Sequence, residues 1–176
     1  MKYEGYRRIF LGTLLVLVNI QIGSVVIFPD IVGYIVIAVG IGMLLQEHNH
    51  KALRGARHLS WAIVIVEGVT WLLFRGDLRL VGWSEGIMIV LGSMSLAMRY
   101  LIIEAEKVSM ELEVEQKVWQ KKQNIYLVLH TLSLIGLSFR MNASAISAVL
   151  IVVAISYEIY WLSMLAQLKQ KVKRAP

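Results

Sequence analysis

The chain has 176 residues, of which 57% are hydrophobic and 17% are charged, with a net charge of +6 and no cysteine. A soluble domain is about 25% charged, so this composition indicates a membrane protein, which we treat as a single transmembrane domain. The lack of cysteine excludes disulfides and thiolate chemistry. No nucleophile elbow, P-loop, dinucleotide-binding or zinc-protease motif is present, so we expect neither an enzyme nor a cofactor.

Apolar segments follow one another along the chain, and their lengths predict the fold. A bilayer core of about 30 Å needs about 20 helical residues. Cut to that measure, the sequence predicts an all-α polytopic bundle of six transmembrane helices arranged as three antiparallel hairpins. We expect no signal peptide, because the first apolar segment lacks a cleavage site. The predicted spans are residues 9–28, 31–45, 59–74, 81–103, 125–141 and 143–165.

A Pro-Asp pair separates the first two predicted spans. Residues 9–45 form a run of 37 residues in which Asp30 is the only formal charge. One helix of that length would reach about 55 Å and overshoot the membrane. Pro29 cannot donate an amide hydrogen bond, and Asp30 is suited to cap the next helix. We therefore predict a tight turn at Pro29-Asp30.

The segment FPDIVGYIVIAVGI, residues 28–41, carries a family resemblance. It resembles a group of small uncharacterised multi-span membrane proteins of Gram-positive bacteria with a Pro-Asp-x-x-Gly-Tyr hairpin between their first two spans. The matching positions are Pro29, Asp30, Gly33 and Tyr34. The resemblance implies a multi-pass protein of the bacterial plasma membrane and no particular activity.

The distribution of Lys and Arg predicts the orientation of the spans. Fifteen of the 18 cations, Arg99 among them, fall in four segments that alternate with segments holding only Arg75, Arg79 and Arg140. Cationic loops stay in the cytoplasm, so both termini are expected there. The same charges favour contact with anionic lipids, and nothing in their pattern indicates nucleic-acid binding.

The segment after the fourth span, residues 104–123, mixes both charge signs and is rich in helix formers. We expect a cytoplasmic helix that extends the fourth span. It is either a solvated extension or a docking surface for a partner, with Trp119 as its apolar anchor. A homo-oligomer is left open.

Ionisable residues inside predicted spans are candidates for function, because burying them in lipid is costly. Glu67 lies in the middle of the third span, and we expect it to face the bundle. His130 and Glu158 belong to neighbouring helices, and both are expected in the inner third of the membrane, where they are placed to pair. Asn19 and Gln21 of the first span either hold helices together or, with Glu67, form a candidate site for a small polar ligand. Glu67 and the pair of His130 and Glu158 are likewise either proton-linked groups or structural contacts between helices.

The sequence EHNH, residues 47–50, suggests a metal, but the cationic residues that follow it oppose one, so no metal site is expected. The remaining features favour binding or transport of a small solute, as a transporter or a transporter subunit, with Glu67 or the His130 and Glu158 pair as a proton-linked element. The alternative is a membrane sensor, chaperone or scaffold that does not transport and engages a partner through residues 104–123.

Overall fold

The computed structural model describes residues 2–18, 21–22, 25–26, 30–74, 81–110, 112–139 and 144–174. Six helices and one short pair of strands account for the regular structure there, so the predicted all-α class is confirmed. The elements are α1 (Lys2–Leu17), β1 (Gln21–Ile22), β2 (Val25–Val26), α2 (Asp30–Glu47), α3 (Lys51–Phe74), α4 (Val81–Val108), α5 (Glu113–Phe139) and α6 (Ser144–Arg174).

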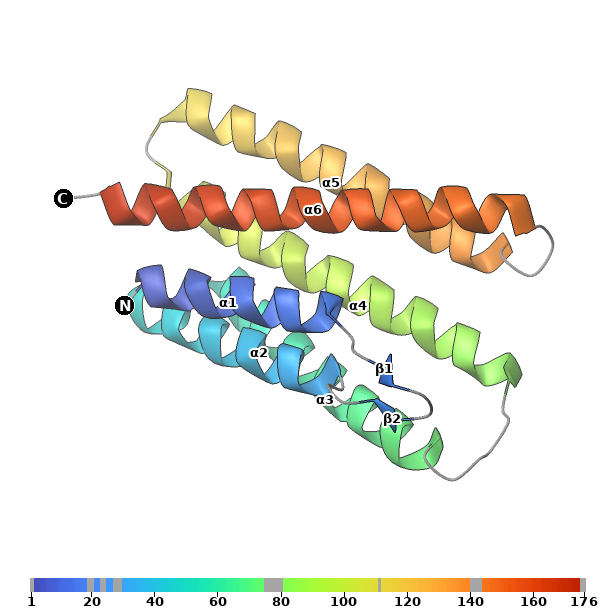
Figure 1. The fold of residues 1–176 in the computed structure, drawn as a ribbon. Coiled ribbons are helices and arrows are strands. Elements are labelled where there is room, and N and C mark those ends of the chain that lie inside the picture. The colour runs from blue at the N-terminus through green and yellow to red at the C-terminus, as the bar shows by residue number, and fades with distance from the viewer. Residues whose placement is uncertain are drawn as a thin grey trace.

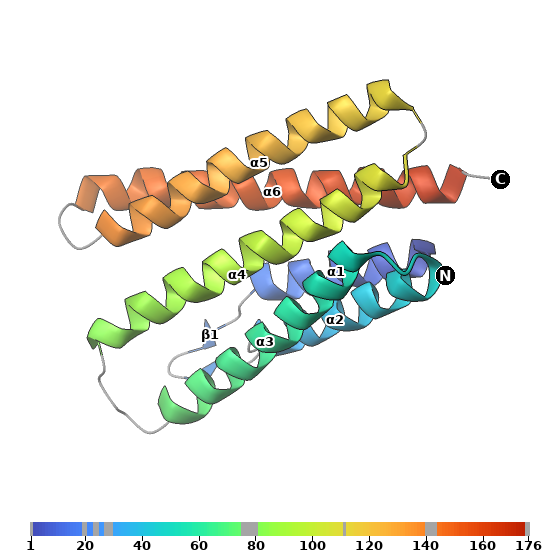
Figure 2. The ribbon, with the colours of Figure 1, turned by 180° about the vertical axis from the view of Figure 1, so that it is seen from behind.

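The helices form a closed ring: each packs on its neighbour in the sequence, and α6 packs back on α1. The N- and C-terminal ends lie together at one end of the bundle (Figure 1). Viewed from behind, α4 runs diagonally between the α5–α6 pair and the group formed by α1, α2 and α3 (Figure 2). The α2–α3 and α4–α5 connections therefore lie at the same end as the termini, which is the arrangement that the predicted threading requires.

Glycines bring α1 and α2 into backbone contact. A β-carbon added at Gly12 would lie 2.6 Å from the carbonyl oxygen of Gly33, and one added at Gly33 would lie 2.7 Å from that of Gly12. Seven residues further along α2, a β-carbon on Gly40 would lie 2.8 Å from the Gly5 carbonyl oxygen. Any larger side chain at these positions would push the two helices apart, so the glycines set their spacing.

The first predicted span is wrong in its extent. Helix α1 begins at Lys2 and ends at Leu17, and residues 21–22 pair with residues 25–26 as antiparallel strands, whereas we expected a helix from residue 9 to residue 28. The strand residues Ile22, Val25 and Val26 are β-branched and favour extended backbone. The two residues between the strands are Gly and Ser, a composition typical of a two-residue hairpin connection.

The second connection is short, and α3 begins earlier than predicted. Helix α2 ends at Glu47 and α3 begins at Lys51, not at residue 59. The His50 ring takes the place of a helix cap, because its Nδ1 accepts a hydrogen bond from the Ala52 amide at 3.3 Å. This local contact gives one of the EHNH histidines a structural role.

The single helical extension predicted for residues 104–123 is also wrong, because the chain turns back within it. Helix α4 ends at Val108 and α5 begins at Glu113, so the segment belongs to two antiparallel helices. Lys107 Nζ donates to Gln123 Oε1 at 2.9 Å across this turn. The turn buries Met110 and Trp119, which are only 4% and 5% exposed. Trp119 is therefore a core residue rather than the exposed anchor that we predicted.

Two helices are long and apolar enough to cross a membrane, judged by length and composition over the described residues: α2 and the Gly86–Val108 part of α4. Helix α1, with 16 residues, reaches only about 24 Å at 1.5 Å per residue. The six-span arrangement therefore stays a prediction, and α1 is the helix that fits it least well.

Candidate functional site

A buried ion pair joins α4 to α6 inside the ring. Arg99 Nη1 of α4 donates to Glu158 Oε1 of α6 at 2.8 Å, and the two side chains are 2% and 12% exposed. The guanidinium carbon also lies 5.5 Å from the centre of the Trp161 ring, a distance typical of a cation–π contact. Because a buried charge is stable only when it is paired, these contacts hold Arg99 in the interior.

The ion pair continues into α5 through a tyrosine and a histidine. Arg99 Nη1 also donates to the Tyr126 hydroxyl at 3.1 Å. The Tyr126 oxygen lies 2.8 Å from His130 Nδ1, four residues further along α5. The tautomer of the His130 ring decides which of the two atoms donates in this hydrogen bond. The result is a continuous hydrogen-bonded chain from His130 to Tyr126, Arg99 and Glu158.

Two further helices reach this chain. The Trp161 indole Nε1 donates to Thr13 Oγ1 of α1 at 3.3 Å, and Thr13 Oγ1 donates to the Ile9 carbonyl at 2.9 Å. Tyr34 of α2 is 7% exposed and lies near enough to Arg99 for its hydroxyl to feel that charge. Five of the six helices therefore meet around Arg99, which makes it the polar centre of the bundle.

The centre is not fully satisfied. Arg99 Nε and Glu158 Oε2 are buried and have no hydrogen-bond partner among the described residues. Such atoms are rare in native proteins, because each costs about 1–3 kcal/mol, and more when the group is charged. A guanidinium and a carboxylate often pair through two parallel hydrogen bonds, whereas this pair uses one. Arg99 and Glu158 thus each keep one buried polar atom that their single hydrogen bond does not use.

His130 and Glu158, which the sequence placed close together, belong to this one chain. They do not contact each other directly: Tyr126 and Arg99 lie between them. His130 is 2% exposed and its ring lies 4.4 Å from that of Tyr157. His130 and Glu158 therefore belong to one hydrogen-bonded chain, but Tyr126 and Arg99, which the prediction did not include, connect them.

Glu67 lies in a different part of the bundle. It is half-buried on α3, and it is close enough to Asp30, the first residue of α2, for the two charges to interact. Ser60, seven residues earlier on the same face of α3, donates to the Tyr34 carbonyl at 3.2 Å, so this side of α3 faces α2. Asp30 Oδ1 has no hydrogen-bond partner among the described residues, and its capping role stays a prediction.

The remaining predicted residues divide between described and undescribed parts of the chain. Asn19 and Pro29 lie outside the described residues, and Gln21 is described only by its backbone in β1. The proposed ligand site of Asn19, Gln21 and Glu67 is therefore untested. Gly33 and Tyr34 of the hairpin motif are both buried in α2, Gly33 against Gly12.

Arg99 is the functional candidate that sequence reasoning missed. We counted it among the cations that orient the chain, although residue 99 falls inside the predicted fourth span, 81–103. A cation within an apolar span needs a partner, and Glu158 was already a candidate. The position of Arg99 inside a predicted span was therefore a sign of function, but Arg99 was used only to predict the orientation of the chain.

Within the described residues, no group of three or more His, Asp and Glu side chains is placed to hold a metal ion. No family model, curated protein or solved structure matches this chain. The family resemblance of residues 28–41 therefore stays a prediction. The geometry of the Arg99 centre is the feature from which we infer a function.

Proposed function

We propose that this chain is a multi-pass protein of the bacterial plasma membrane that binds or transports a small anionic solute together with a proton. The Arg99 centre is the binding element. The observation that carries the proposal is the incomplete pairing of Arg99 and Glu158, each of which keeps one buried atom without a partner. A centre that only glued helices together would gain stability from a second hydrogen bond.

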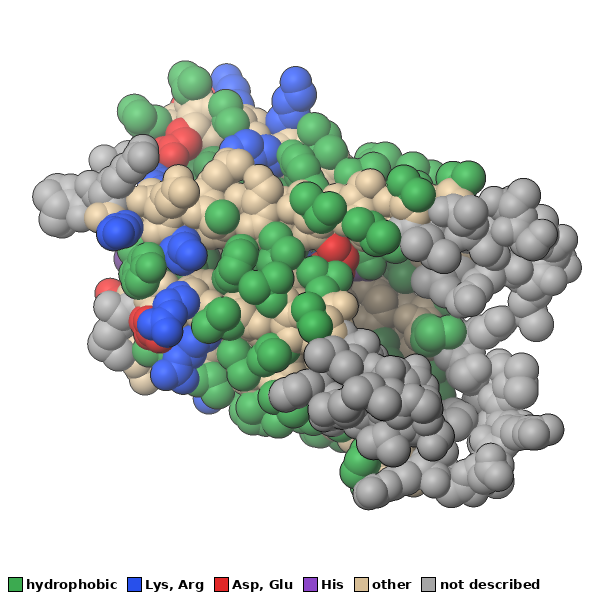
Figure 3. Space-filling view, in the orientation of Figure 1, with side chains coloured by type: hydrophobic (Ala, Val, Ile, Leu, Met, Phe, Trp, Pro, Cys, Tyr) green, Lys and Arg blue, Asp and Glu red, His purple; other side chains and the backbone are tan. Residues whose placement is uncertain are grey.

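The surface of the bundle supports the membrane location. Large apolar side chains are exposed on every helix, among them Ile65 at 64%, Val152 at 63% and Leu132 at 52%, while Arg99 and His130 are buried. Apolar residues outside and ionisable residues inside are typical of a bundle surrounded by lipid. In Figure 3, Lys and Arg side chains gather at the end that holds the termini, and hydrophobic side chains cover most of the other described surface. The positive-inside rule makes that end cytoplasmic.

The charge balance of the centre supports coupling to a proton. Arg99 keeps its charge at any physiological pH, and the Glu158 carboxylate is its counter-ion. Protonating Glu158 would leave the guanidinium buried without a counter-ion, a state that costs several kcal/mol. An entering carboxylate or phosphate would remove that cost. Proton uptake at Glu158 and anion binding at Arg99 are therefore favoured together.

A thermal-shift measurement on purified protein tests this proposal, with small carboxylates and inorganic phosphate as probes at pH 5.5 and pH 8. We expect an anion to raise the melting temperature more at the lower pH, because anion binding at Arg99 and proton uptake at Glu158 favour each other. Glu158→Gln, which mimics the protonated acid, should give the same rise at both pH values. The proposal fails if no probe acts on the wild type, or if Glu158→Gln keeps the pH dependence.

One observation favours the alternative of a membrane module that engages a protein partner. Four large apolar side chains are exposed around the α4–α5 turn, at the end that holds the termini. This patch is separate from the Arg99 centre, so its removal by Leu112→Ser and Val114→Ser should leave the anion effect unchanged. The exposed residues are Val108 (59%), Leu112 (69%), Val114 (76%) and Val118 (48%).

A further inference from the structure

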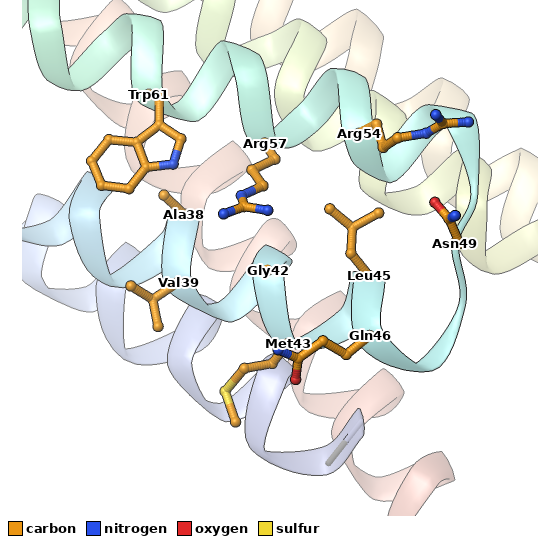
Figure 4. A pocket seen from close by; sticks show the side chains of 10 residues that line it. All are labelled: Ala38, Val39, Gly42, Met43, Leu45, Gln46, Asn49, Arg54, Arg57 and Trp61. Carbon is orange, nitrogen blue, oxygen red and sulfur yellow. The ribbon is translucent and has the colours of Figure 1, made fainter.

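A groove between α2 and α3 opens at the end of the bundle that holds the termini. Its volume is about 510 Å³, within the usual range for ligand pockets. Two arginines of α3, Arg54 and Arg57, and two polar residues, Gln46 and Asn49, line its outer half. Figure 4 shows Arg57 reaching across the groove toward α2, with Arg54 and Asn49 nearer the α2–α3 connection.

The other half of the groove is apolar. It is lined by Ala38, Val39 and Met43 of α2 and by Trp61 of α3, whose ring is 40% exposed. In Figure 4 Trp61 and Val39 lie at the end of the groove away from Asn49. The lining is thus cationic and polar with one apolar residue, Leu45, at the Asn49 end, and it is apolar at the Trp61 end. Trp side chains in membrane proteins favour this boundary between headgroups and hydrocarbon.

Gly42 forms the floor below the Arg57 guanidinium. The nearest atoms to a β-carbon built on Gly42 are Arg57 Cζ and Nε, both at 3.9 Å, which is van der Waals contact with a flexible side chain. It differs from Gly33 and Gly40 of the same helix, where an added β-carbon would strike α1. Gly42 therefore gives the Arg57 guanidinium room to lie close to α2.

Among the described residues, neither Arg54 nor Arg57 forms an ion pair with an acidic side chain, whereas Lys2 and Lys107 do. The described lining of the groove also contains no Asp or Glu. Two guanidiniums in a lining without a described acid favour a phosphate, which a guanidinium binds through parallel hydrogen bonds.

We propose that this groove binds an anionic phospholipid, with its phosphate in the outer half that Arg54 and Arg57 line and an acyl chain along Val39 and Trp61. The change from cationic to apolar lining matches a lipid better than a free anion, because a soluble phosphate would leave the apolar half unused. The inference rests on the membrane location proposed above and is independent of the Arg99 centre.

Lipid-dependent stabilisation of the full chain in detergent tests the proposal, with phosphatidylglycerol and phosphatidylcholine as matched probes. We expect phosphatidylglycerol to raise the melting temperature more than phosphatidylcholine. Arg54→Gln/Arg57→Gln should weaken phosphatidylglycerol binding by about tenfold or more, since each cation near an anionic lipid contributes about 1 kcal/mol. Lys117→Gln/Lys121→Gln removes the same charge from α5 and should bind as the wild type does.

Gly42→Leu provides a second test that keeps both arginines and fills the floor. The new side chain would meet the flexible end of Arg57 rather than backbone, so folding should be preserved, while it fills the floor where the Arg57 guanidinium lies and phosphatidylglycerol binding is lost. Gly68→Leu is its control, because a β-carbon there meets no atom within 4 Å. Gly42→Leu also decides the question if the double arginine variant does not fold.

Three results would overturn the proposal. Equal loss in Lys117→Gln/Lys121→Gln would mean that general surface charge attracts the lipid. An equal effect of glycerol phosphate or inorganic phosphate would make a soluble anion the occupant. Full phosphatidylglycerol binding by Gly42→Leu would exclude the groove. Glu158→Gln should keep lipid binding, so failure of the anion-transport proposal would be recognised separately.

Discussion

Arg99 determines the chemistry of the bundle interior because it is a permanent charge among apolar helices. The Glu158 carboxylate, the Tyr126 hydroxyl and the Trp161 ring all lie around its guanidinium. A buried ion pair need not add net stability, since its desolvation cost offsets its attraction. What it does impose is dependence, because removing the charge of one partner leaves the other buried without its counter-ion.

We predict strong coupling between the two members of the pair. Arg99→Met should lower the free energy of unfolding by about 3–5 kcal/mol, because it leaves the Glu158 carboxylate buried without a partner. Arg99→Met/Glu158→Leu should lower it by less than Arg99→Met alone, because no charge remains. Denaturant titration in detergent micelles of the wild type, both single variants and the double variant measures this coupling. Additive losses in the double variant would show that the pair does not interact.

Single elements are defined by different forces along the chain. Helices α1 and α2 approach until their backbones touch at Gly12 and Gly33, so their contact depends on the absence of side chains. The α4–α5 turn depends on the opposite, the burial of the large Met110 and Trp119 side chains. Larger side chains would therefore disrupt the α1–α2 contact, whereas smaller side chains would disrupt the α4–α5 turn.

We predict that Gly12→Ala destabilises the protein by about 1–3 kcal/mol, the usual cost of overpacking. Its β-carbon would lie 2.6 Å from the Gly33 carbonyl oxygen, and a backbone atom cannot rotate away. Gly68→Ala is the matched control. It adds the same methyl group inside a helix where no atom lies within 4 Å, so it should be neutral or stabilising by up to about 1 kcal/mol. Thermal unfolding in detergent compares the two, and equal stability would exclude close α1–α2 packing.

The boundaries of the helices were predictable where the composition of the sequence changes sharply. They were not predictable where tertiary packing determines them. Helix α2 begins at Asp30, directly after Pro29, and the uninterrupted apolar sequence that follows predicted it to within two residues at its end. The turn after Val108 contains neither Gly nor Pro, so local propensity gave no sign of it. The Arg99 centre escaped for a related reason, because it joins residues from five helices that are distant in the sequence.

At the scale of the whole molecule, large apolar side chains lie both in the core and on the outer surface. The interior is mainly hydrophobic, and Ser60, Ser95, Thr13, Arg99 and His130 are the polar groups buried within it that this bundle has to satisfy. β-Branched and aliphatic residues are also exposed along the helices, and a soluble protein rarely exposes apolar patches of this extent. The outer surface is therefore the part of the molecule that supports the proposed membrane location.

The last prediction separates a membrane-embedded bundle from a soluble one by cysteine labelling, which the chain allows because it has no native cysteine. Ile65→Cys and Val152→Cys lie at positions that are 64% and 63% exposed on the bundle surface. In intact membranes they should resist a hydrophilic maleimide from both sides, because lipid covers them, and they should react after solubilisation in a denaturing detergent. Cysteines at Asn49, Glu113 and Lys173 should react from the cytoplasmic side alone, and those at Asp30, Gly76 and Asn142 from the outside alone. If Ile65→Cys and Val152→Cys react in intact membranes as fast as Asn49→Cys, the apolar surface faces water, and the membrane location and both binding proposals built on it would have to be abandoned.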